Sequence, residues 1–154
     1  MSLAYAALLC LHLLAATLWV GGMLVMHVAV RPAAVATLQP PLRLSFMAAT
    51  LERFFAWVSG GIVVLLLSGL AMLGITGGFR TAHWSVHAMF GVGVLMMLIF
   101  AHIRFGPFRR LRQAIAAHDW PGAGPQMNRI RQLVVLNLVL GTAVYLVAVL
   151  GRAV

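Results

Sequence analysis

Four histidines form two pairs with the same internal spacing, and each pair lies inside one long apolar segment. His12 and His27 are 15 residues apart, and so are His87 and His102. If the two segments are helices that run in the same direction, the four side chains form two levels about 22 Å apart. A neutral imidazole is a good iron ligand, and two stacked b-type haems need two such levels of paired histidines. The spacing therefore predicts redox chemistry inside a helical bundle.

The composition decides where such a bundle resides. Hydrophobic residues make up 63% of the 154 residues and charged residues only 8%, whereas a soluble domain has about 25% charged residues. The sequence thus predicts an all-α integral membrane protein whose main partner is the lipid bilayer. We expect one domain, residues 1–154, built as a four-helix bundle. Its spans are expected at about residues 3–30, 54–75, 82–103 and 133–150.

Several functional classes are excluded or disfavoured. The net charge of +9 comes entirely from arginine, and because the arginines flank the spans, we expect no nucleic-acid partner. The two carboxylates, Glu52 and Asp119, lie outside the spans, which argues against proton-coupled transport. The sequence has no C-x-x-C-H motif, so covalent attachment of a c-type haem is excluded.

The distribution of arginine predicts the orientation. The first and third loops together hold nine arginines, whereas the opposite side holds only Arg80 and Arg152. This asymmetry predicts that both termini lie outside (N-out, C-out) in a multi-pass protein of the bacterial inner membrane. The first apolar run is expected to be a retained span rather than a cleaved signal peptide.

The loops carry secondary-structure signals of their own. A short interfacial helix is expected at residues 42–53, after the Pro40-Pro41 break. A very short second loop predicts a tight hairpin of the second and third spans. The third loop, residues 104–132, is expected to turn at Trp120-Pro121-Gly122.

Depth decides which histidines form a pair. His12 and His87 lie in the outer halves of parallel spans, and His27 and His102 lie near the inner ends. A separation of 15 residues leaves a rotation of about 60°, so the imidazoles of one level diverge unless tilt or a local bulge corrects them. Two other interpretations remain open: an interfacial position, or a hydrogen bond to a neighbouring helix.

Small and basic residues flank the predicted levels. Gly22 and Gly91 lie between them, where a missing side chain favours close approach either of a porphyrin or of another helix. Arg31, Arg104 and Arg80 lie near the membrane faces. There they are expected either to bind haem propionates or only to set the topology.

Copper is the alternative cofactor. His83 and His87 are four residues apart, a spacing that can chelate a metal, although His83 is equally typical of an interface. Met23 and Met26 lie close to His27, and thioethers suit Cu(I). Methionine is also a common filler of apolar cores.

Three further side chains in the spans suggest contacts within the bundle. Trp19 lies deep in the first span, where it is expected to pack against a flat cofactor or in the core. Asn137 and Tyr145 in the last span are expected to form interhelical hydrogen bonds.

Four segments resemble the copper-resistance protein D (CopD-like) membrane family. They are LHLLAATLWVGGM, which contains His12, RFFAWVSGGIVVLLLSGLAML, FGPFRRLR and LVVLNLVLG. The resemblance implies an inner-membrane protein of copper uptake or haem chemistry. A fainter likeness links the histidine and tryptophan of the first span to HemJ-type protoporphyrinogen oxidases, which are small haem-containing membrane proteins.

These observations predict a membrane bundle that carries one or two b-type haems, two being favoured. The outer haem would be held by His12 and His87 and the inner haem by His27 and His102. Such a protein would move electrons across or within the membrane, as an oxidoreductase linked to a quinone or a periplasmic donor. The alternative is copper import or handling through histidine and methionine, with His83 as a further ligand. A homodimer is left open.

Overall fold

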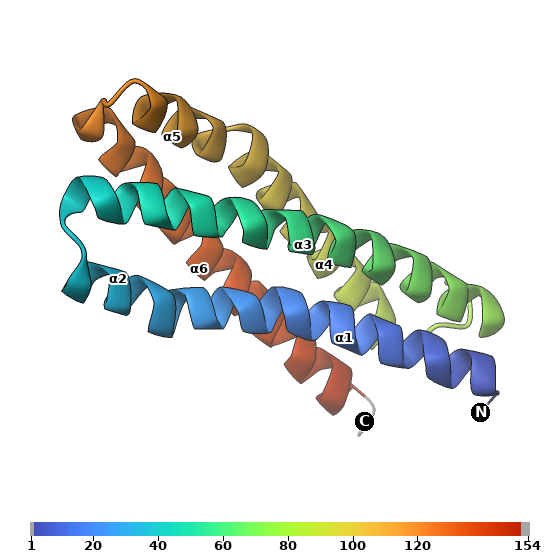
Figure 1. Cartoon of the computed structure of the whole chain (residues 1–154). Coiled ribbons are helices and arrows are strands. Elements are labelled where there is room, and N and C mark those ends of the chain that lie inside the picture. Colours follow the sequence, from blue (N-terminus) through green and yellow to red (C-terminus); the bar gives the residue numbers. More distant parts are fainter. Residues whose placement is uncertain (1, 152–154) are drawn as a thin grey trace.

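The chain is helical throughout the part that the structure describes. In a computed structural model, residues 2–151 are described and contain no strand (Figure 1). The elements are α1 (Leu3–Val25), the π-helical turn η1 (Met26–Val30), α2 (Arg31–Thr37), α3 (Pro40–Ile75), α4 (Trp84–Phe105), α5 (Pro107–Ala116) and α6 (Trp120–Leu150). Four stretches are long and apolar enough to cross a membrane: Leu3–Thr37, Pro40–Ile75, Trp84–Ala116 and Trp120–Leu150. The prediction of an all-α multi-pass membrane protein is confirmed.

The helices extend well past the predicted spans. Helix α3 has 36 residues, about 54 Å at 1.5 Å per residue, against a hydrocarbon core of about 30 Å. The prediction of a separate interfacial helix at residues 42–53 is wrong, because this segment continues into the second span. Pro40 and Pro41 lie in the first turn of α3, where a helix needs no N–H, so they start the helix and nothing later interrupts it.

The third loop is also more helical than predicted. Helix α5 follows α4 after a bend at Gly106, and α6 already begins at Trp120. The predicted turn at Trp120-Pro121-Gly122 is wrong, because Asp119 accepts a hydrogen bond from Gly122 N at 2.9 Å and caps α6. The chain turns just before this cap, at His118, whose φ is 54°.

Proline also explains the π-helical turn η1. Pro32 has no N–H to donate to the carbonyl four residues earlier, and its ring crowds that carbonyl. The helix continues by widening: the N–H of Arg31 donates to the carbonyl of Met26, five residues back. His27 therefore lies in an irregular turn of a kind that often occurs at functional sites.

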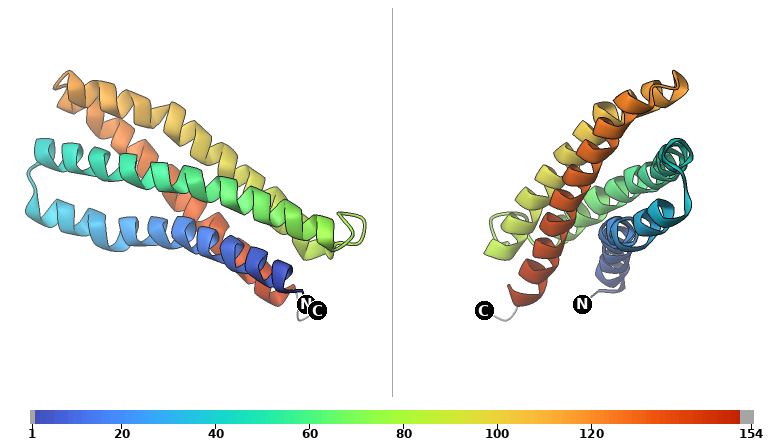
Figure 2. Two further views of the ribbon diagram at one scale, coloured as in Figure 1. Left: turned by 45° about the vertical axis from the view of Figure 1, so that its right-hand side comes forward. Right: turned by 90° about the vertical axis from the view of Figure 1, so that its left-hand side faces the viewer.

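The bundle consists of two helix pairs. Helix α1 packs mainly against α3, and α4 packs mainly against α6, with a smaller contact between α1 and α6. Figure 2 shows these pairs as two layers. The predicted short connection between the second and third spans is present at residues 76–83. The predicted tight hairpin of these two spans is wrong, because α3 and α4 each pack mainly against another helix.

Both basic connections lie at one end of the bundle. The turns from α2 to α3 and from α5 to α6 lie at that end, and the α3–α4 loop lies at the other (Figure 1). We call the first end the basic end and the other the distal end. An ion pair at the basic end joins Arg112 of α5 to Glu52 of α3, with an N–O distance of 2.8 Å. Arg80 lies in the α3–α4 loop, and Arg152 lies outside the described residues.

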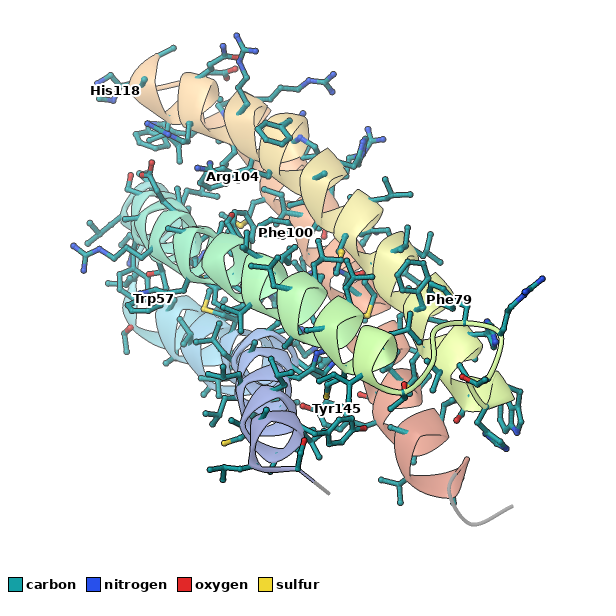
Figure 3. All side chains as sticks on the ribbon, turned by 90° about the vertical axis from the view of Figure 1, so that its right-hand side faces the viewer. Trp57, Phe79, Phe100, Arg104, His118 and Tyr145 are labelled. Carbon is teal, nitrogen blue, oxygen red and sulfur yellow. The ribbon has the colours of Figure 1, made fainter. Side chains whose placement is uncertain are left out.

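Aromatic side chains join the two layers in the half of the bundle nearer the basic end. Phe55 of α3 makes edge contacts with Phe100 and Phe108, with ring centroids 5.5 and 5.1 Å apart, and Trp19 of α1 contacts Phe100 at 6.0 Å. Phe100, which takes part in two of these contacts, is labelled in Figure 3. Each such pair contributes about 0.5–1.5 kcal/mol beyond the burial of area. This aromatic core fixes the helices whose distal halves carry the polar side chains described next.

Candidate functional site

His12 lies on the interior face of α1. Ala15, Trp19, Met23 and Met26 on this segment are all buried. At about 100° per residue, these four positions fall within roughly 60° of the direction of His12. The His12 side chain is half-buried. It is thus the distal member of a row of side chains that faces the bundle interior.

The His12 ring is held by two consecutive residues of α3. Its Nδ1 lies 2.9 Å from the Oγ of Ser68, and Ser68 is only 3% exposed. At Gly69 a Cβ would lie 3.2 Å from Cε1 of the ring, tighter than an ordinary contact. Ser68 supplies a hydrogen bond and Gly69 supplies space, and we call these two residues the histidine seat.

The structure does not bring His12 and His87 together. Both His87 and His102 are exposed, and His87 lies about 180° around α4 from the buried Met96. The ring of His87 packs beside Phe79 of the α3–α4 loop, with centroids 5.6 Å apart. The histidine pairs proposed as haem ligands therefore remain predictions, and the geometry of one chain does not favour them.

His27 and His102 also occupy different local structures. His27 is half-buried in the π-helical turn η1, whereas His102 lies in the last turn of α4 and its backbone carbonyl accepts from Gly106 N at 2.9 Å. The irregular turn begins at Met26. The helix from His12 to Val25 is regular, so most of the 60° rotation between His12 and His27 remains.

His83 caps a helix. It is the N-cap residue of α4, and its Nδ1 accepts a hydrogen bond from the backbone N–H of Ser85 at 3.4 Å. The hydroxyl of Ser85 lies 3.0 Å from the same nitrogen. These contacts give His83 a structural role at the distal end, and its proposed part as a copper ligand remains a prediction.

The two glycines singled out in the sequence differ in their surroundings. A Cβ at Gly22 would collide with the ring of Phe54, so this glycine allows α1 to approach α3. The neighbours of Gly22 favour its interpretation as a site of helix packing over its interpretation as room for a porphyrin. Among residues 2–151, a Cβ at Gly91 would meet nothing within 4 Å.

The three arginines expected near the membrane faces lie at both ends. Arg31 begins α2 and Arg104 lies in the last turn of α4, both at the basic end, while Arg80 is exposed in the α3–α4 loop. The guanidinium of Arg104 lies 5.4 Å from the ring centroid of Phe108, a cation–π contact. Contacts to propionates remain a prediction for all three.

Interhelical hydrogen bonds of the last span are confirmed. Asn137 Nδ2 donates to the backbone carbonyl of Met96 at 3.2 Å, and Tyr145 shares a hydrogen bond of 3.1 Å with Thr17. Figure 3 shows the Tyr145 ring directed toward α1. These bonds tie α6 to both α4 and α1 around the row that begins at His12.

Comparison with protein families gives one match. The model of the family "Copper resistance protein D" (CopD) matches residues 48–150. The chain belongs to the CopD family. Comparisons with curated proteins and with solved structures found no match.

Membership in the CopD family relates this membrane protein to copper resistance, as predicted from the resemblance. The matched region begins within α3 and contains the histidine seat, but it does not contain α1. Ser68 and Gly69 therefore lie inside the region that matches the CopD family. His12 lies outside this region, so its place in the candidate site rests on its contacts alone.

The donor set of this CopD chain suits a soft metal better than a hard one. Within residues 2–151, no three side chains of His, Cys, Asp or Glu lie close enough to hold a metal ion together. Thioethers are more numerous in the interior: Met23, Met26, Met47 and Met96 are all buried in one core. Thioether sulfur favours Cu(I) over harder cations.

The sequence did not identify the histidine seat. Ser68 is the only hydroxyl residue in the apolar stretch of residues 60–73, and this isolation was the available signal. It is weak because a serine in a helix satisfies its own hydroxyl by bonding to the carbonyl four residues earlier.

Proposed function

We propose that this CopD-family protein binds Cu(I) inside its helical bundle as part of copper handling at the membrane. The observation that carries the proposal is that His12 shares one interior face with buried methionines. An imidazole and thioethers are ligands suited to Cu(I). Ionisable side chains inside a membrane are often functional.

The proposed distal site combines His12 with Met72. Met72 is four residues from Ser68 on the same face of α3 and is half-buried. Residues with this spacing have Cβ atoms about 5–6 Å apart. Because Ser68 holds the His12 ring, we propose that the Met72 thioether reaches the same ion at this level.

The buried methionines provide a second level. Met23 is 11 residues beyond His12, about 16 Å along the helix, so no single ion contacts both side chains. Met96 faces the same core from α4 and lies beside the interhelical bond from Asn137. We propose that copper moves between the two levels along the interior face of α1.

The haem hypothesis remains as the alternative, together with its electron transfer and its quinone or periplasmic donor. It requires His87 as an iron ligand, whereas the copper proposal gives His87 no part. The orientation with both termini outside, the bacterial inner membrane and a homodimer also remain proposals. They are supported only by the arginine asymmetry and by the apolar surface.

The test compares three variants of the detergent-purified protein with the wild type: His12→Ala, Met72→Leu and His87→Ala. Cu(I) is titrated anaerobically against a chromophoric competitor for all four proteins, and optical spectra are recorded before and after reduction. We expect Cu(I) binding that falls at least tenfold in His12→Ala and in Met72→Leu, and is unchanged in His87→Ala.

Two results would contradict the copper proposal. One is an absence of Cu(I) binding by the wild type. The other is a reduced b-type haem spectrum that both His12→Ala and His87→Ala abolish, which would establish the haem ligands instead.

A further inference from the structure

The proton of the Ser68 hydroxyl has a defined acceptor. Ser68 Oγ lies 2.6 Å from the carbonyl oxygen of Val64 and 3.3 Å from that of Leu65. A carbonyl oxygen only accepts, so the single hydroxyl proton is donated back into α3. Toward His12 the same oxygen therefore offers only lone pairs.

This arrangement determines which nitrogen of His12 carries the proton. The 2.9 Å contact between Nδ1 and Ser68 Oγ needs one donor, and because the hydroxyl proton is already used, the donor is Nδ1–H. A neutral imidazole has a single N–H. Its Nε2 then carries the lone pair that is left for a ligand.

We infer that Ser68 and Gly69 are positioning residues that hold His12 in its Nδ1–H tautomer and present Nε2 as the ligand atom. The inference about the tautomer stands on the contacts of the seat. Only the identity of the ligand, Cu(I), rests on the proposed function. Ser68 acts through His12 and does not itself touch the metal.

His83 shows the opposite arrangement in the same chain. Its Nδ1 accepts from the backbone N–H of Ser85, and a backbone N–H only donates. Neutral His83 therefore carries its proton on Nε2 and has no free lone pair to offer. His83 is an internal reference with the other tautomer.

Partners of this kind have a measurable effect on metal binding. A hydrogen bond to the second nitrogen of a ligating histidine fixes its tautomer and its ring orientation, and loss of the partner costs about 10–100-fold in metal affinity. Gly69 contributes by leaving room for the ring, because a Cβ at this position would press on Cε1 of His12. Gly74 of the same helix has no neighbour within 4 Å of its would-be Cβ, so Gly74→Ala is a matched control.

The experiment measures the tautomer without copper and the affinity with it. Metal-free protein labelled with ¹⁵N-histidine is studied by NMR, and the His12 signals are assigned by their loss in His12→Asn. We expect the Nδ1–H form in the wild type and in Ser68→Thr, which keeps the hydroxyl. Ser68→Ala and Gly69→Ala should shift the population toward Nε2–H, and Gly74→Ala should not.

The Cu(I) titration gives the second measurement. Affinity should fall about 10–100-fold in Ser68→Ala and remain near the wild-type value in Ser68→Thr. An Nε2–H tautomer in the wild type would overturn the inference even if copper binds. An unchanged tautomer in both Ser68→Ala and Gly69→Ala would overturn it as well. Two variants are used so that the test still holds if one of them fails to fold. The expected tautomer in a protein that binds no Cu(I) would support the seat and refute the proposed function.

Discussion

Gly22 lies at a close contact between α1 and α3, and its neighbour Gly21 provides a control one residue away. A Cβ at Gly22 would overlap the Phe54 ring. At Gly21 the nearest atom, Cγ2 of Thr17 in the same helix, would be 3.9 Å away, an ordinary contact. Gly22→Ala and Gly21→Ala therefore introduce the same methyl group into α1, once into a packed interface and once into free space.

The difference between these two variants isolates the packing cost. Replacing glycine by alanine inside a helix stabilises it by up to about 1 kcal/mol, and this gain applies to both positions. Forcing a methyl group into a packed interior costs about 1–3 kcal/mol, because the Phe54 ring or the helix has to move. We expect Gly22→Ala to be less stable than Gly21→Ala by about 1–3 kcal/mol, since the common gain cancels.

The assay is reversible unfolding in mixed micelles, in which the fraction of dodecyl sulfate is raised and far-UV circular dichroism is recorded. The wild type and both variants are measured at the same detergent concentration. Equal stability of the two variants would refute the close approach of α1 and α3. It would also reopen the interpretation that Gly22 makes room for a porphyrin.

The other predictions test the core, the helix cap and the interhelical bond by the same unfolding assay. Phe55→Ala should cost about 3–5 kcal/mol because this ring is buried among aromatic partners, while Trp57→Ala, at a side chain 71% exposed, should cost under about 0.5 kcal/mol; similar losses would contradict the aromatic core. His83→Ala should cost about 0.5–2 kcal/mol and His83→Asn far less, because asparagine also caps helices. Cu(I) affinity should not change in either His83 variant, and its loss would restore His83 as a ligand. Tyr145→Phe and Thr17→Val should each cost about 0.6 kcal/mol and show coupling in a double-mutant cycle; additive effects would argue against their bond.

Membrane insertion followed from the sequence because it depends on sums over long segments. Four apolar runs and nine clustered arginines predict the spans and their charge asymmetry without any knowledge of packing. The ends of the helices could not be predicted from the sequence in the same way. Proline was taken as a break at Pro40 and Pro121, whereas at the first turn of a helix it lacks only an N–H that would be unpaired anyway.

Spacing along the sequence does not decide which histidines face one another, and the reason is geometric. The position of a residue along a helix gives its depth in the membrane directly. The direction in which its side chain points depends on how the helix is rotated about its axis, and this rotation is set by the helices that pack against it. The interior face of α4 is defined by Ser85, Met96 and Phe100, which are buried, and His87 lies on the opposite side. The sequence alone did not show that α4 would pair with α6 rather than face α1.

The sequence places His12 in the first span, but it does not indicate which residues contact its ring. The seat lies on α3, 56 residues away in the sequence, and consists of a serine and a glycine that are ordinary in membrane helices. Only the contact itself distinguishes Ser68 and Gly69 from the other small residues of that span.

The central claim is that Cu(I) is bound inside the bundle by an imidazole and thioethers. X-ray absorption spectroscopy of the Cu(I)-loaded protein measures these ligands directly. We predict a first shell that contains both sulfur and a histidine nitrogen, and the nitrogen contribution should disappear in His12→Ala. A copper spectrum without sulfur, or one unaffected by His12→Ala, would contradict the account.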